Sequence, residues 1–185
     1  MNKLIKKVLV GITAATMMLG SVCTAYAATD SATVAPAPEQ QTNVKTDNGT
    51  KVSTSTEGNA RIKGLPTSVA SKKSVTVPSK ITVDGVSYTV ATLGKGALAN
   101  ATKATKVTLP STITAIGNYS FKGATSVKTV VVTSTKAVKV SSKAFKGVNT
   151  KKMTIKVTKM STKQFKAFKA QLKKAGFKGT VKLVK

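Results

Sequence analysis

The chain has 185 residues, enough for one domain of ordinary size with tails, and its 31 basic and 5 acidic residues give a net charge of +26. Histidine is missing, and Cys23 is the single cysteine. This composition excludes a Ser-His-Asp triad, a histidine metal site, a zinc knuckle and an internal disulfide.

Residues 1–27 have the layout of a secretory signal peptide. Three lysines within residues 3–7 precede a short apolar stretch, Val8–Leu19, and Ala25–Ala27 supplies small residues at a cleavage site. The pattern predicts export with cleavage after Ala27, and no transmembrane segment after cleavage because the apolar run is too short. An uncleaved amphipathic N-terminus is the alternative.

Cys23 lies where a lipidated cysteine could stand. A lipoprotein signal has a small residue just before the cysteine and usually a leucine three before it, whereas this chain has Val22 and Gly20. We therefore expect Cys23 to leave with the signal peptide, so that packing alone would stabilise the mature protein.

Residues 28–70 are rich in Thr, Ser, Ala, Asn, Gln and Pro and contain few large apolar residues. The segment Ala35-Pro36-Ala37-Pro38 is typical of an extended, solvated chain. A packed domain would need more apolar side chains, so this composition predicts a disordered linker that acts as a spacer.

A β-hairpin is expected where the folded part begins, near residue 71. Apolar residues alternate over 75–83 and again over 86–90, with Asp84-Gly85 between the two runs. Asp-Gly is a strong hairpin signal because both residues tolerate the positive φ of a tight turn.

An internal repeat follows the hairpin. Residues 93–98 resemble residues 116–121, which lie 23 positions later, and residues 140–145 follow after a further 24. The apolar positions of residues 104–109 recur in residues 127–132, again 23 apart. Each unit therefore carries one expected strand, a polar turn and a small-plus-aromatic pair.

This period predicts a leucine-rich-repeat solenoid. One strand per unit, repeated about every 23 residues, builds a parallel sheet whose units must stack to bury their apolar positions. The third strand, residues 153–157, is one residue out of phase. The predicted fold is β-rich α/β: a short solenoid over residues 71–157 with an N-terminal β-hairpin and a C-terminal capping helix.

The segment from Val107 to Gly123, Val-Thr-Leu-Pro-Ser-Thr-Ile-Thr-Ala-Ile-Gly-Asn-Tyr-Ser-Phe-Lys-Gly, resembles the repeat of the BspA-type leucine-rich-repeat family. That repeat has a strand, Pro, an Ile or Val, Ile-Gly-x-x-Ala-Phe and a small residue. Leu98 and Ala104 replace larger residues that the family prefers. The resemblance covers residues 75–157 and implies adhesion to host matrix proteins or to other cells.

Residues 158–185 are expected to cap the solenoid. Ser161–Gln164 fits a capping box, and Phe165, Phe168 and Leu172 recur at helical spacing before Gly176. The pattern predicts a helix over residues 162–175, followed by a strand near residues 180–184.

The acidic residues are too few and too scattered for acid-base chemistry. Four lie in the predicted linker and the fifth in the hairpin turn: Asp30, Glu39, Asp47, Glu57 and Asp84. No pair is spaced for general acid and base work, and the segment 86–185 offers neither carboxylate nor imidazole to a metal ion. The sequence therefore predicts no catalytic, cofactor-binding or metal-binding residues and no enzymatic activity.

The positive charge has two interpretations. The last 100 residues hold 21 lysines, no arginine and no acidic residue. This surface either keeps an exported protein soluble or attracts polyanions. Lysine without arginine disfavours base-specific recognition of nucleic acid. The expected partners are therefore an extracellular protein or an anionic glycan or cell-wall polymer.

Strand alternation defines a candidate binding face. If the apolar residues of the repeats point inward, the residues between them point outward. The expected outward residues are Lys106, Thr108, Thr129, Val131, Lys152 and Thr154. Repeat proteins commonly bind partners on such a surface.

These observations support two hypotheses of function. The first is an exported, non-enzymatic leucine-rich-repeat binding module, secreted or held at the cell surface, that acts in adhesion. The alternative is a structural envelope protein held to anionic cell-wall polymers by its lysine charge.

Overall fold

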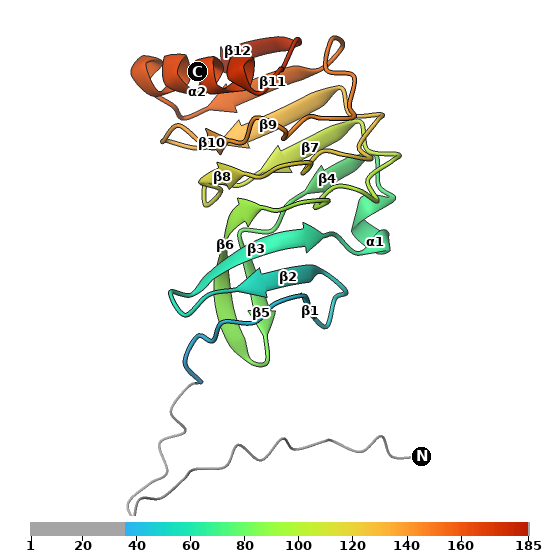
Figure 1. Cartoon of the computed structure of the whole chain (residues 1–185), viewed down its shortest axis with the longest axis vertical. Helices are drawn as coiled ribbons and strands as arrows, with labels where there is room; N and C mark the ends of the chain where they lie inside the picture. The colour runs from blue at the N-terminus through green and yellow to red at the C-terminus, as the bar shows by residue number, and fades with distance from the viewer. Residues whose placement is uncertain (1–35, 185) are drawn as a thin grey trace, which may run out of the picture. The chain divides into compact units, whose positions relative to one another are not determined.

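The computed structural model describes residues 36–184 (Figure 1), so the predicted signal peptide and residues 28–35 lie outside the described part of the chain. The described residues form two sheets and two helices. Successive coils of the chain stack on one another and build both sheets. The short helix α1 is Thr67–Ala70, and α2 is Thr162–Lys174.

The first sheet has five parallel strands in the order β12-β11-β9-β7-β4. Their bounds are Ser74–Thr76 for β4, Lys106–Leu109 for β7, Thr129–Thr133 for β9, Thr154–Thr158 for β11 and Thr180–Val184 for β12. One row of in-register residues points into the core and is at most 1% exposed: Val75, Val107, Val130 and Ile155.

The second sheet has seven strands in the order β1-β2-β3-β6-β8-β10, with β5 also paired to β6. Their bounds are Val44–Lys45, Lys51–Thr54 and Asn59–Gly64 for β1 to β3, Lys80–Val83 and Val86–Leu93 for β5 and β6, Ala115–Ile116 for β8 and Lys139–Val140 for β10. Strands β1 to β3 pair antiparallel, whereas β3, β6, β8 and β10 pair parallel.

Successive strands from β6 to β11 alternate between the two sheets, so each coil of the chain gives one strand to each sheet. This arrangement confirms the predicted solenoid of parallel strands. The step from Lys106 to its partner Thr129 is 23 residues, and the step from Thr129 to Thr154 is 25. The extra residues lie in the turns before β11 and leave the pairing intact.

Aromatic rings from successive coils stack between the sheets. The ring centroids of Phe121 and Phe145 lie 4.8 Å apart, and those of Phe145 and Phe177 lie 5.2 Å apart. All three rings are buried, and Phe121 is fully so. The repeated aromatic position therefore forms a continuous column that runs into the C-terminal cap.

The Ile-Gly step of the repeat lets adjacent coils approach closely. The Gly117 N–H donates to the Leu93 carbonyl oxygen at 2.7 Å, and a Cβ on Gly117 would lie 3.0 Å from that oxygen. A larger side chain there would push the coils apart. In the next coil Ser141 makes the matching bond to the Ile116 oxygen at 2.9 Å, so this coil leaves room for a Cβ.

The predicted hairpin is confirmed. Strands β5 and β6 pair antiparallel with Val83 opposite Val86, which leaves Asp84 and Gly85 as the two turn residues. Their φ angles are 49° and 79°, as a two-residue turn of this kind requires.

The prediction of a disordered linker over residues 28–70 is wrong for residues 44–70. Strands β1 to β3 and helix α1 lie there, and β3 pairs with β6 as part of the seven-stranded sheet. Val52 and Ile62 are fully buried. The composition misled because buried threonines take the place of large apolar residues: Thr46, Thr50 and Thr54 are at most 7% exposed and hydrogen-bonded.

The C-terminal helix and strand are confirmed. Ser161 Oγ accepts from the Gln164 N–H at 3.3 Å, which caps the start of α2. At the other end Gly176 has φ of 75°, and the Phe177 N–H donates to the Leu172 oxygen at 3.0 Å. Strand β12 then joins the five-stranded sheet beside β11.

Helix α2 takes the place of a strand beside β10. The Ala137 N–H donates to Gln164 Oε1 at 3.0 Å, and the Val140 N–H donates to Gln171 Oε1 at 2.9 Å. The two glutamines are seven residues apart and therefore share one face of the helix. Their amide oxygens satisfy the edge of the seven-stranded sheet where the next strand would otherwise pair.

Candidate binding surface

The outward side of the five-stranded sheet, called the strand face below, carries two in-register rows of side chains. The first row is Ser74, Lys106, Thr129, Thr154 and Thr180. The second row is Thr76, Thr108, Val131, Lys156 and Lys182. Every one of these side chains is at least partly exposed.

The strand face brings together five of the six residues expected there from the sequence. Lys106, Thr129 and Thr154 share the first row, and Thr108 and Val131 share the second. Lys152 does not reach this face: it lies in the turn two residues before β11 begins.

The position expected of Lys152 was wrong because the loop before β11 is longer than in the preceding coil. Lys156 takes the matching place in the second row, directly beside Val131. The buried residues Ile155 and Val157, which alternate with Lys156, are the signal from which it could have been found.

The chemistry of the strand face is that of hydroxyls and ammonium groups. Neighbouring strands of a sheet lie about 4.8 Å apart, so each row forms a regular ladder of side chains. Hydroxyls donate and accept hydrogen bonds, lysines attract anions, and Val131 adds a half-buried apolar contact between Thr108 and Lys156. Since neither row contains a carboxylate, this face suits a partner that is acidic or rich in hydrogen-bond acceptors.

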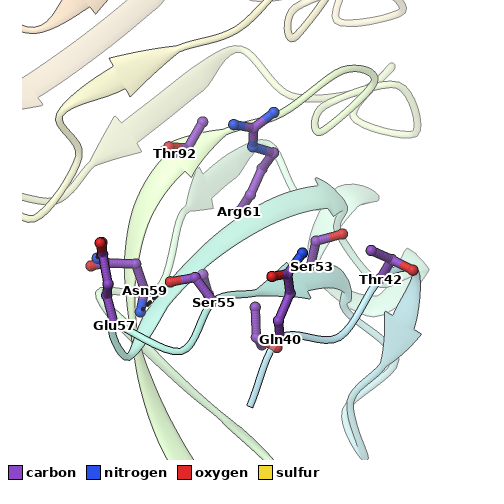
Figure 2. A pocket seen from close by; sticks show the side chains of 10 residues that line it. Gln40, Thr42, Ser53, Ser55, Glu57, Asn59, Arg61 and Thr92 are labelled. Carbon is purple, nitrogen blue, oxygen red and sulfur yellow. Dashed lines mark hydrogen bonds between the residues drawn. The ribbon is translucent and has the colours of Figure 1, made fainter. Parts of the chain in front are cut away.

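A separate polar pocket of about 290 Å³ lies on the seven-stranded sheet near its N-terminal end (Figure 2). Arg61, the one arginine of the chain, lines it together with Ser53 and Thr92, which are its in-register neighbours on β2 and β6. Asn59 Nδ2 donates to Glu57 Oε2 at 3.5 Å on the same rim. All these side chains are at least partly exposed.

This polar pocket could not be recognised from the sequence, because most of its lining belongs to the segment interpreted as a linker. The isolated arginine in a lysine-rich chain was the available signal. Its neighbours include hydroxyl and amide side chains and the Glu57 carboxylate but no aromatic ring, and all except Thr54 and Ala60 are at least partly exposed. The pocket therefore offers hydrogen bonds but little burial to a ligand.

Within residues 36–184, no three His, Cys, Asp or Glu side chains lie close enough together to hold a metal ion. Neither helix of that part of the chain has the length and apolar run that a membrane crossing requires.

Comparison with known proteins identifies the repeat. The family model described as the BspA type leucine-rich repeat region (6 copies) matches residues 91–184. The match begins within β6, the second strand of the hairpin, and continues through α2 to β12. No curated protein matches the chain.

Two solved structures are similar to this chain. One is a leucine-rich repeat protein from Bacteroides capillosus, 17% identical, with a TM-score of 0.47, and the alignment covers 81% of this chain and all of that one. The other is a leucine-rich cell surface protein from Faecalibacterium prausnitzii, 20% identical, with a TM-score of 0.44. That alignment covers 69% of this chain and 34% of the larger protein.

Proposed function

Because the chain belongs to the BspA-type leucine-rich repeat family, we propose that it is an exported, non-enzymatic binding module, secreted or held at the cell surface, that recognises an extracellular protein. The strand face is the proposed contact surface. Adhesion to a protein-coated surface or to another cell is the activity expected of such a module.

One observation carries this proposal: the pairing of β7, β9 and β11 aligns hydroxyl, lysine and valine side chains from three separate coils on one side of the sheet. A solenoid that served only as a spacer would not need a particular outward residue in each strand. A protein surface with exposed carboxylates and backbone carbonyls complements these rows.

The test measures retention of the purified protein on fibronectin-coated and bare surfaces across a salt gradient. Val131→Glu places a carboxylate in the middle of the strand face and should abolish salt-resistant retention. Thr82→Glu adds the same charge at an exposed position of β5, on the other sheet, and should leave it unchanged. Equal retention of both variants would contradict a role for the strand face.

A second candidate function rests on the charge of the whole folded part. The 21 lysines and the missing carboxylates after residue 85 favour attraction to anionic cell-wall polymers, independent of any one face. Such attraction is screened over about 8 Å at physiological ionic strength. Complete release from isolated cell envelopes at moderate salt, equal for Val131→Glu and Thr82→Glu, would support this candidate over the first.

A further inference from the structure

The two sheets end differently at the C-terminal end of the stack (Figure 1). Helix α2 closes the seven-stranded sheet, but β12 is the last strand of the five-stranded sheet within residues 36–184. The Thr180 N–H donates to the Met153 oxygen at 3.0 Å, toward β11. Because alternate residues of a strand point their backbone groups to opposite sides, the N–H and C=O groups of Val181 and Leu183 face the outer edge.

The inward side of β12 is also incompletely covered. Ile155 and Val157 of β11 are at most 1% exposed, yet their in-register neighbours Val181 and Leu183 are only partly buried. One more strand beside β12 would bury this apolar surface as each earlier strand buries its neighbour's.

A groove of about 480 Å³ opens between α2 and the segment that leads into β12. Apolar side chains form its floor: Leu172, Phe177 and Val181. Lysines surround it: Lys166, Lys169, Lys173 and Lys178. The groove therefore continues the apolar side of β12 and adds a ring of positive charge.

The positive charge around the groove determines which kind of partner can bind there. A second copy of this chain would place its own lysines against the lysines around the groove, and the like charges would repel. Lysines on an edge strand are a known way to prevent edge-to-edge pairing between copies of a protein. A strand whose apolar residues alternate with carboxylates would instead turn its carboxylates outward, to the side of Lys182, and the groove lysines would attract it over a longer distance. Its apolar residues would rest on Val181 and Phe177.

We propose that the open edge of β12 and the groove beside it bind an extended segment of a partner protein, in which apolar residues alternate with Asp or Glu, as an added β-strand. The alternation matches the period of a strand, and the backbone groups of Val181 and Leu183 supply hydrogen bonds independent of sequence. This surface shares Lys182 with the strand face, but it does not depend on the function proposed for that face.

The test uses three labelled nine-residue peptides and fluorescence anisotropy. The first alternates Glu and Val, the second has the same composition with all valines together, and the third alternates Lys and Val. The first should bind, the second should bind about tenfold more weakly or worse, and the third should not bind. Equal binding of the first two would overturn strand addition.

Hydrogen exchange locates the bound peptide. Addition of the alternating Glu/Val peptide should slow exchange of the Val181 and Leu183 amides and leave Val131, on the strand face, unchanged. Binding without slower exchange at Val181 and Leu183 would overturn the proposal. A dimer of this chain that dissociates when the peptide is added would also overturn the proposal. Binding of phosphatidylglycerol vesicles to the groove, without binding of the peptide, would overturn it as well.

A pair of double variants separates the groove from total charge. Lys169→Glu with Lys173→Glu reverses two groove lysines and should weaken peptide binding about tenfold. Lys163→Glu with Lys174→Glu makes the same change in net charge at exposed positions of α2 outside the groove. An equal loss in both double variants would assign the binding to general electrostatic attraction and overturn the proposal.

Discussion

The two ends of the solenoid are closed by different means. At the N-terminal end β1 to β3 extend the seven-stranded sheet by strand pairing, and buried hydroxyls hold the turns together. At the C-terminal end helix α2 stops the same sheet with two glutamine side chains and covers the coils with an apolar face. One end adds a structure of its own, whereas the other modifies the last coil of the repeat.

The difference shows how a short repeat protein can be stable without disulfides. A coil can satisfy its open edge either with more backbone or with side-chain amides that imitate backbone. Within the N-terminal strands, local hydrogen bonds hold the turn before β2: Asn48 Oδ1 accepts from Thr46 Oγ1 at 2.6 Å and from Thr50 Oγ1 at 2.7 Å. At the C-terminal end, the two glutamine hydrogen bonds join residues that are 27 and 31 positions apart in the sequence.

The largest expected effect tests whether both ends rest on one cooperative core. Phe121 is fully buried and stacks on Phe145, so Phe121→Ala should lower the free energy of unfolding by about 3–5 kcal/mol. Urea unfolding measures this loss, and hydrogen exchange at Val52 and Leu172 should show that both ends lose protection together. If one end of the Phe121→Ala variant keeps its protection from hydrogen exchange, the two ends unfold as independent units.

Asn48→Ala tests the N-terminal end and should cost about 2 kcal/mol. The variant removes an acceptor shared by three donors: Thr46 Oγ1, Thr50 N and Thr50 Oγ1. Both threonines are buried, so their hydroxyls have limited access to water. Thermal unfolding of Asn48→Asp provides the control, because the carboxylate keeps the acceptor oxygen. An equal loss of stability in both variants would show that the turn, and not this network, determines the stability of the N-terminal end.

The same contrast explains which parts of the fold could be predicted from the sequence. The C-terminal cap carries its signals in order: a serine N-cap, apolar residues at helical spacing and a glycine with positive φ. The N-terminal strands have turns at Asp47-Asn48 and Thr56-Glu57, each followed by a glycine with positive φ, but Thr54 fills a buried strand position where valine would have indicated a strand. Composition alone cannot distinguish a buried threonine that bonds to its neighbours from one in solvent.

The candidate site shows the same limit at the scale of one loop. Alternation placed Lys106 and Val131 correctly, because β7 and β9 are separated by the regular repeat. Lys152 was misplaced since the longer loop before β11 shifts the strand, and pairing geometry, not spacing, decides that Lys156 lies beside Val131. The polar pocket around Arg61 depends on the register of β2, β3 and β6 and could not be predicted while residues 28–70 were interpreted as a linker.

The smallest expected effect tests whether glutamine imitates a strand at the C-terminal end. Gln171→Leu keeps a side chain of similar size but leaves the Val140 N–H without its acceptor, which should cost about 1 kcal/mol because water can partly replace it. Gln171→Glu keeps an acceptor oxygen and should retain stability in urea unfolding. Exchange of the Val140 amide should be faster in Gln171→Leu alone. If Gln171→Glu accelerates it equally, helix packing protects the edge of β10 and the amide oxygen does not, and the two ends would then differ less than their contacts indicate.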